Sequence, residues 1–541
     1  MYRAFFICLV AVLVSCSQHK KGEEKRTVFR YNESKGITSL DPAYAKDNTV
    51  IWPTTQLFNG LVEMDDSLHV VPAIAKGWEI SSDSRIYTFY LRKDVRFHDH
   101  PLFKDSIGRT VSAHDFVYSF LRIVDPRVAS PGFSLFKMVE KPFDGAGFKA
   151  INDSVFQITL QRPFASFLGL LTMPYCFVVP HEVVEYYGND FRNHPVGTGP
   201  FMFKTWREGE KLVLVKNPKY FEVDSTGKRL PYLDAIAVTF ISDKQSEFLE
   251  FMKGNIDFLS GVNAAYKDEM ITRAGQLNPK YADRIHMEVL PYLNTEYLTF
   301  MVDPNKASQK IILNKNFRTA INYGFDRAKM VKYLRNNLCS PAYWGIIPAG
   351  LPGFSKEGTA YKYDPDKASE YLAKAGYPNG HGLPEIKLTT TSDYLDLCEF
   401  IQHELSQIGI KIGIEVSPLA SFKQNKADGN LPFFRGSWIA DYPDAENYLS
   451  LFYSRNFSPN GSNYSHFKDE EYDRLYVQAV AEPDMAKRIG LYERMNGIVV
   501  RESVIIPLYY DKVVRFYPKN IHHFKGNSLN ILKLKSVYKE D

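Results

Sequence analysis

The segment Pro432–Pro443, PFFRGSWIADYP, is the most informative stretch of the chain. Because proline cannot donate to a β-ladder, its prolines are expected to mark the ends of a strand. Side chains alternate between the two faces of a strand, so Arg435, Ser437, Ile439 and Asp441 should share one face. The segment therefore predicts a strand with a cation near its start and a carboxylate near its end, on the same side.

This pair of charges suits a ligand that is charged at both ends. The backbones of Arg435 and Asp441 would lie roughly 20 Å apart, and side chains that lean inward would leave room for an extended tripeptide of about 10 Å. Its amine would meet Asp441, and its carboxylate could form a bidentate pair with Arg435. The peptide would pair with the strand backbone, which is the same for every ligand sequence. The alternative is that the two residues are unrelated surface or structural ion-pairing groups, and for an arbitrary strand this is the commoner case.

The N-terminus predicts export and anchoring. Arg3 precedes the apolar run Ala4–Val14, which is shorter than the roughly 20 residues of a membrane span. Leu-Val-Ser-Cys then ends at Cys16 and resembles a bacterial lipobox, in which the cysteine receives a lipid. We expect residues 1–15 to be a signal peptide and residues 16–27 to be the lipidated cysteine and a flexible polar tether. The alternative is an ordinary secretory signal with an incidental cysteine.

Composition indicates a folded chain of several domains. The chain has 541 residues, 24% of them charged and 45% hydrophobic, as in ordinary globular proteins. The net charge of +4 forms no basic stripe, so nucleic-acid binding is not expected. Cys176, Cys339 and Cys398 remain after the leader and anchor, and their odd number implies at least one free thiol.

Helical and strand patterns alternate irregularly along the chain, which predicts a mixed α/β (α+β) fold. Alternation predicts strands over 86–92, 212–215 and 235–241. Periodicity and capping residues predict helices over 112–124, 319–337, 364–376, 469–481 and 484–501. Ser112 is the expected N-cap of the first helix, with Asp115 at its third position. Pro365 should open the 364–376 helix.

Six segments, in order, resemble the extracellular solute-binding proteins of family 5, which include the periplasmic oligopeptide-binding proteins of ABC transporters. The GSWIADY motif at 436–442 is one of them. The others are SLDPAYAKDN (39–48), TVSAHDFVYSFLRIVDPRVASP (110–131), GTGPFMF with NPKYF and LPYLDAI (197–236), NFRTAINYGFDRAKMV (316–331) and YDPDKASEYLAKAGYPNG (363–380). The resemblance covers the chain from about residue 28 to its end.

The resemblance implies a two-lobed, three-domain periplasmic-binding-protein-like fold that closes on its ligand about a hinge. Domain I would comprise 28–58, 197–292 and 512–541, domain II 59–196, and domain III 293–511. It also implies a monomer that delivers short peptides to an ABC permease and touches the membrane through its lipid alone. We expect no cofactor and no enzymatic activity.

The resemblance further implies a set of ligand-binding residues. Asp441 would bind the peptide amine, and Arg435 the carboxylate of a tripeptide. Arg335 would take the carboxylate of peptides of other lengths. Backbone groups that pair with the peptide would come from Ser437, Trp438 and Ile439 and from the segment between Lys46 and Asn48.

Other functions remain open from the sequence. A receptor for a metal chelate, an oligosaccharide or a signalling peptide would share the fold, whereas an anchored hydrolase or a chaperone-like binder would belong to another class. His98-Asp99-His100 could suggest a metal site, but an exposed loop is the favoured interpretation. No GxSxG, HExxH or P-loop motif is present to support an enzyme.

Overall fold

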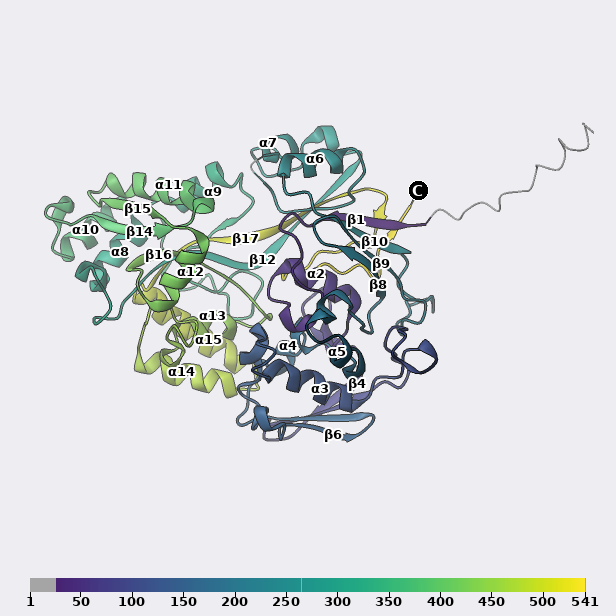
Figure 1. Cartoon of the computed structure of the whole chain (residues 1–541). Coiled ribbons are helices and arrows are strands. Elements are labelled where there is room, and N and C mark those ends of the chain that lie inside the picture. The colour runs from purple at the N-terminus through teal and green to yellow at the C-terminus, as the bar shows by residue number, and fades with distance from the viewer. Residues whose placement is uncertain (1–25, 264, 541) are drawn as a thin grey trace, which may run out of the picture.

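The protein consists of two lobes connected by a pair of long strands (Figure 1). The structure, a computed structural model, describes residues 26–263 and 265–540. Strands β12 (Ile285–Phe300) and β17 (Ile505–Pro518) lie antiparallel and run from one lobe into the other. Their pairing register shifts between Pro291 and Thr295 and again between Glu296 and Tyr297. The connection between the lobes is therefore a two-stranded ribbon with an irregular middle.

Lobe 1, as we use the term, contains two four-stranded sheets. In the first, the order is β1-β10-β9-β8, with bounds Val28–Asn32, Ala235–Thr239, Lys211–Lys216 and Phe201–Arg207. In the second, the order is β4-β5-β7-β6, with bounds Ala75–Ile80, Ile86–Leu91, Val155–Thr159 and Phe148–Asn152. Because β1 pairs parallel with β10, the first strand of the described residues is hydrogen-bonded to a strand about 200 residues later.

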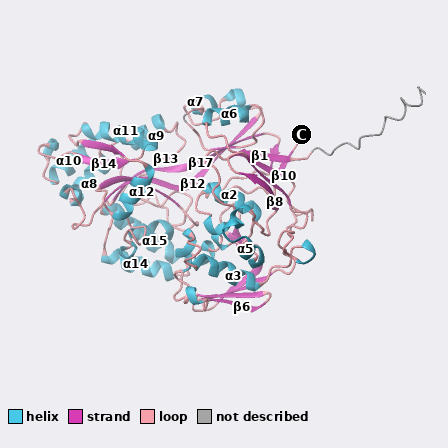
Figure 2. Ribbon diagram, in the orientation of Figure 1, coloured by secondary structure: helices cyan, strands magenta, loops and turns pink. Residues whose placement is uncertain are grey.

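Helices and short strands complete lobe 1 (Figure 2). The helix α3 (Ala113–Val124) packs against β6 and β7. The remaining elements are α2 (Asn48–Leu57), α4 (Phe167–Leu170), α5 (His181–Tyr187), α6 (Lys244–Met252), α7 (Lys267–Met270), β2 (Val62–Met64), β3 (Val70–Pro72), β18 (Ile521–His522) and β19 (Tyr538–Lys539).

Lobe 2 is built on a seven-stranded sheet to which the two connecting strands also belong. Its order is β11-β17-β12-β16-β14-β15, and β13 pairs with β17. The bounds are β11 (Leu259–Ser260), β13 (Ser340–Pro341), β14 (Ile386–Thr390), β15 (Ile412–Val416) and β16 (Phe433–Ile439). Its helices are α8 (Lys315–Tyr323), α9 (Arg327–Leu334), α10 (Pro365–Lys374), α11 (Leu395–Ser406), α12 (Leu419–Asp428), α13 (Glu446–Leu449), α14 (Glu470–Ala481) and α15 (Met485–Arg501).

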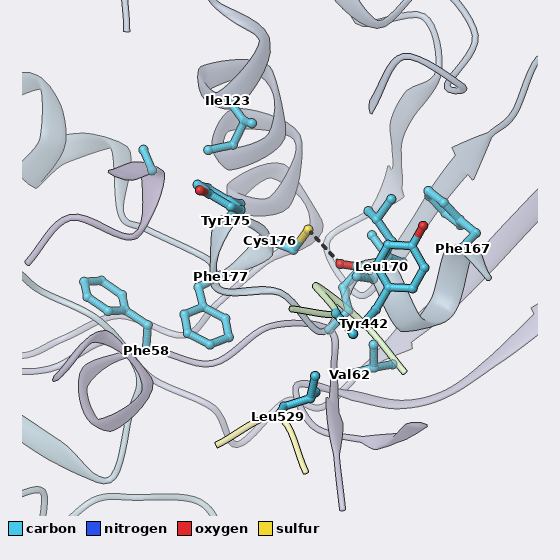
Figure 3. Close-up of a cluster of buried hydrophobic side chains, with 14 of the residues drawn as sticks. Phe58, Val62, Ile123, Phe167, Leu170, Tyr175, Cys176, Phe177, Tyr442 and Leu529 are labelled. Carbon is cyan, nitrogen blue, oxygen red and sulfur yellow. Dashed lines mark hydrogen bonds between the residues drawn. The ribbon is translucent and has the colours of Figure 1, made fainter. Parts of the chain in front are cut away.

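The lobes also touch away from the connecting strands. The amide of Ala165 in lobe 1 donates to the carbonyl of Val480 in lobe 2 at 2.9 Å. Tyr442 of lobe 2 lies beside Leu170 and Cys176 of lobe 1 in a buried apolar cluster (Figure 3). A contact of this kind joins the two lobes by apolar packing.

Most of the predicted local elements are confirmed. Ser112 and Asp115 form the expected capping box at the start of α3, and α10 begins at Pro365 behind the N-cap Asp364. Cys176, Cys339 and Cys398 are all free and buried, in agreement with the predicted free thiol. Among the described residues, no helix is both long and apolar enough to cross a bilayer. The predicted signal peptide and Cys16 lie outside the described residues.

The single helix predicted over 319–337 is wrong, because the structure has two helices there. The first ends at Tyr323, and Asp326 caps the second by accepting from the amides of Ala328 and Lys329. Arg327 is fully buried and donates to the backbone carbonyls of Asn322, Tyr361 and Pro507. A turn between the helices lets this guanidinium satisfy carbonyls that a continuous helix would not reach.

Candidate ligand-binding site

Strand β16 has one paired edge and one largely open edge. It pairs with β12 along its whole length, from Phe433 to Ile439. On the other side, β14 pairs with it at Phe434 alone. Within the described residues, the edge beyond Phe434 therefore has no neighbouring strand. An extended ligand could add there as a further strand.

The backbone groups on this open edge follow from the ladder pattern. Hydrogen bonds of an antiparallel pair involve alternate residues. At the ends of the β12–β16 pairing, Ala440 donates to Leu293 and Met301 donates to Pro432. Even-numbered residues of β16 thus bond to β12, and the amides and carbonyls of Ser437 and Ile439 point to the open edge. This orientation suits the predicted pairing with a peptide.

The predicted strand is too long, and Asp441 lies outside it. Strand β16 ends at Ile439, where the chain bends toward α13. Asn447 of α13 holds this bend, since its Oδ1 accepts from the Trp438 indole at 2.8 Å and from the Asp441 amide at 3.2 Å. The shared-face argument therefore does not extend to Asp441, whose position is set by Asn447.

The Asp441 carboxylate forms no ion pair with any cation of the described residues. Its one side-chain partner is the Asn447 amide, which donates to Oδ2 at 3.3 Å. Asp441 is exposed to solvent, yet desolvation by surrounding protein atoms raises the pKa of its carboxyl. The carboxylate is thus reached by water and also partly desolvated by neighbouring protein atoms. A ligand cation would stabilise the ionised form of such a carboxylate by forming an ion pair with it.

The segment Lys46–Asn48 of lobe 1 lies near Asp441. Burial raises the pKa of the Tyr175 phenol, and the charges of Asp441 and Asp47 raise it further. Both carboxylates are thus within electrostatic range of one tyrosine. Lys46 is exposed, and Asn48 opens α2. The structure therefore brings this predicted segment and Asp441 to the same region, from opposite lobes.

Arg435 is already engaged within the protein. Its guanidinium forms a buried ion pair with Glu296 of β12. It also stacks over the ring of Tyr394, with 3.3 Å between its central carbon and the ring centroid. Its Nε has no hydrogen-bond partner among the described residues. The residue predicted to bind a ligand carboxylate thus holds a carboxylate of the protein itself.

Arg335 is engaged in the same way. Its Nη1 donates to Asp396 at 2.8 Å, in an ion pair that is partly exposed. Arg335 and Asp396 both line a cavity of about 830 Å³. We call it the hinge cavity, because Tyr292, Asp511 and other residues of the β12–β17 ribbon form part of its wall, beside residues of both lobes.

The acidic residues that follow Asp441 have structural roles. Tyr442 and Tyr476 donate to the buried carboxylate of Glu446, and burial raises the pKa of this group to about 7. Asp444 accepts from Tyr492 at 2.6 Å and forms an ion pair with Arg488. These contacts connect α13 to α14 and α15, which support the bend that carries Asp441.

The histidine pair of the sequence offers no metal site in the part of the chain that the structure describes. The His98 ring is buried and uses both nitrogens, one with the Gly199 carbonyl at 3.0 Å and one with the Gly197 amide at 3.3 Å. No cluster of three or more metal-ligating side chains is found among those residues. The interpretation of His98-Asp99-His100 as an exposed loop is therefore wrong for His98, which is a core residue.

Comparison with known proteins settles the family. The family model for bacterial extracellular solute-binding proteins, family 5 (middle region), matches residues 69–460. The chain belongs to this family. Its resemblance to these proteins, inferred from six motifs, is thereby confirmed, as is the mixed α/β fold.

Relatives extend over nearly the whole chain. The glutathione-binding protein GsiB of Escherichia coli is 27% identical over 495 residues, which cover 90% of each chain. The DppA periplasmic binding protein of Helicobacter pylori, solved in complex with the peptide STSA, is 26% identical. It has a TM-score of 0.77 and covers 96% of this chain and 99% of its own. HbpA2 of Haemophilus parasuis has a TM-score of 0.81 at 23% identity, covering 95% and 100%, and shows the fold alone.

Sequence reasoning missed the partners of the predicted site residues. Glu296 lies 139 positions from Arg435, and Asp396 lies 61 positions from Arg335. No local pattern connects residues so far apart. Asn447 is closer, six positions after Asp441, and sits in the short helix that follows the motif.

Proposed function

We propose that this protein is the lipid-anchored receptor of an ABC importer and binds short peptides between its two lobes. The observation that carries the proposal is the Asp441 carboxylate, which has no cationic partner among the described residues and lies beside the open edge of β16. The α-amine of a peptide would form an ion pair with this carboxylate, and the peptide backbone would form hydrogen bonds with the open edge of β16. Family membership and a relative solved with a bound peptide support it.

In this proposal the peptide's amine end is fixed first. Ser437 and Ile439 and the segment from Lys46 to Asn48 contribute main-chain contacts from the two lobes. The backbone of Trp438, also predicted to pair with the peptide, bonds to β12 instead. The carboxylate reaches Arg435 or Arg335, according to peptide length, and competes there with Glu296 or Asp396. Closure about the β12–β17 ribbon then buries the ligand, and the closed form docks on the permease. The protein acts as a monomer, without catalysis or a cofactor, anchored to a membrane on the periplasmic or cell-surface side.

We further propose the division into three domains. Domain I comprises 28–58, 197–292 and 512–541, domain II 59–196, and domain III 293–511. Residues 1–15 are the signal peptide, and Cys16 carries the lipid at the start of the tether 16–27. Mass spectrometry of the protein from a bacterial membrane fraction would test the anchor, which predicts a diacylglyceryl adduct on Cys16.

A non-peptide solute, such as a metal chelate or an oligosaccharide, is the second candidate. Glutathione, the γ-linked tripeptide that gives the relative GsiB its name, serves as an additional peptide probe. The test is to denature the purified protein, identify what co-purified by mass spectrometry, and measure thermal shifts with tripeptides and glutathione. We expect short peptides to be released and free tripeptides to raise the melting temperature. A released sugar or metal chelate, with no shift from any peptide, would overturn the peptide proposal.

A further inference from the structure

The hinge cavity lies at the far end of the proposed ligand path. A peptide whose amine meets Asp441 and which follows the open edge of β16 runs toward Arg435. The ring of Tyr394, on which Arg435 stacks, also forms part of the cavity wall. A ligand that passes Arg435 therefore reaches the cavity at Tyr394. This step rests on the proposed peptide-binding function.

One carboxylate in the cavity wall lacks a countercharge. Asp511 accepts from the Asn294 side chain at 3.3 Å and from the Lys512 amide at 2.8 Å, and it forms no ion pair with a cation of residues 26–263 and 265–540. Burial raises the pKa of Asp511 to about 6, and the nearby charge of Glu296 adds to the effect. The charge of Arg335 partly opposes this rise, but Arg335 forms no ion pair with Asp511. The carboxylate is thus desolvated without a directly bound cation.

The positively charged side chains that line the cavity either interact with groups other than Asp511 or are exposed to solvent. Arg335 pairs with Asp396, and Lys267 pairs with Asp268 at 3.7 Å. The Lys512 ammonium is directed to the Asn337 carbonyl at 3.5 Å, and Lys35 is exposed. None of them forms an ion pair with Asp511.

Aromatic rings surround the same space. Tyr292, Tyr394 and Tyr509 line the cavity together with Asp511. Burial raises the pKa of all three phenols, and the negative charge of Asp511 raises each of them further. The face of a tyrosine ring attracts a cation, and the attraction grows when the cation is desolvated. Arg435 already lies over the ring of Tyr394, and Arg335 lies over that of Tyr509. Asp511 and the ring of Tyr292 therefore remain for a ligand ammonium or guanidinium group.

We propose that the hinge cavity is a subsite for a positively charged side chain of the ligand, held by the Asp511 carboxylate and the Tyr292 ring. The preferred ligands are peptides with lysine, arginine or a similar cationic residue in their carboxyl-terminal half. The cavity of about 830 Å³ has room for such a side chain together with water. The subsite gives the receptor a side-chain preference that main-chain pairing cannot provide.

Isothermal titration calorimetry with matched peptides tests the proposal. The series comprises tri- and tetrapeptides of alanine that carry lysine, norleucine or glutamate at the third or fourth position. We expect lysine to bind roughly ten- to a hundredfold more tightly than norleucine at one of these positions, and glutamate to bind no better than norleucine. Asp511→Asn should abolish the advantage of lysine and leave norleucine affinity nearly unchanged. Asp366→Asn, at an exposed carboxylate on α10, is the matched control and should change neither.

The outcomes separate this inference from the proposed function. If norleucine peptides bind and lysine brings no advantage, or if glutamate binds best, the cationic subsite is wrong while peptide binding stands. If no peptide of the series binds, peptide binding itself is wrong. Because the comparison of lysine with norleucine uses the wild-type protein, it decides the question even if Asp511→Asn does not fold.

Discussion

The two ends of the proposed peptide site differ in whether the protein already compensates their charge. At the amine end, Asp441 has one neutral partner, Asn447, and no cation among the described residues. At the carboxyl end, Arg435 is paired with Glu296, and Arg335 with Asp396. A ligand amine therefore gains a new ion pair at Asp441, whereas a ligand carboxylate must compete with an existing one. The comparison indicates that the amine end dominates affinity.

The largest expected effect comes from removing the charge at the amine end. Asp441→Asn keeps the shape of the side chain and should weaken tripeptide binding by a hundredfold or more, because the ligand amine would be buried without a countercharge at a cost of about 3–5 kcal/mol. Calorimetry measures this loss, and Asp366→Asn is the control. Affinity within a few-fold of wild type would show that Asp441 does not bind the amine.

The second prediction concerns the contribution of the buried Glu296–Arg435 ion pair to the folding stability of the protein. Glu296→Gln leaves the buried Arg435 guanidinium without its countercharge, which should cost about 3–5 kcal/mol of folding free energy. Thermal unfolding should show a melting temperature several degrees below that of wild type. The double variant Glu296→Gln with Arg435→Met should recover much of this loss, since it buries no unpaired charge. If the double variant is no more stable than Glu296→Gln alone, the pair is not the source of the effect.

The third prediction is that the folding stability of the protein depends on pH through Glu446, which supports the bend at Asp441. Burial raises the pKa of Glu446 to about 7 from its ordinary value of 4.5. Because the folded state favours the protonated form, its contribution to stability is fully present below about pH 4.5 and is lost as the pH rises through about 7. Glu446→Gln should remove this part of the dependence. Parallel melting curves for both proteins between pH 5 and 8 would contradict the assignment.

A smaller effect is expected from the residue that positions Asp441. Asn447→Ala removes the acceptor for the Asp441 amide and the Trp438 indole. Losing these bonds should weaken tripeptide binding by roughly tenfold, less than Asp441→Asn, because the ligand's ion pair remains. Calorimetry with the same tripeptide ranks the two variants. A loss equal to that of Asp441→Asn would mean that Asn447 binds the ligand directly.

Local features of the fold could be predicted from the sequence, whereas features that depend on contacts between distant segments could not. Features set by neighbouring residues were predictable, such as the Ser112–Asp115 capping box and the start of α10 at Pro365. Prediction failed where tertiary contacts override the local pattern. Asn447 bends the chain after Ile439 and takes Asp441 out of the strand. The buried guanidinium of Arg327 binds carbonyls of distant segments at the break between α8 and α9, although Gly324 and Asp326 mark that break locally.

The residues of the proposed site could be named from the sequence, whereas the charges that surround them could not. The GSWIADY motif led to Asp441 and to the open backbone of Ser437 and Ile439. The charge balance at the other end depends on Glu296, which lies in a strand brought beside β16 by the fold. A pattern within one segment contains no information about such a partner.

Blocking each end of one ligand tests the central claim most directly. Calorimetry would compare trialanine, its N-acetylated form and its C-amidated form on the wild-type protein. The account predicts that N-acetylation weakens binding by a hundredfold or more, and that C-amidation weakens it by roughly tenfold or less. Equal losses for the two modifications, or unchanged affinity after N-acetylation, would contradict it.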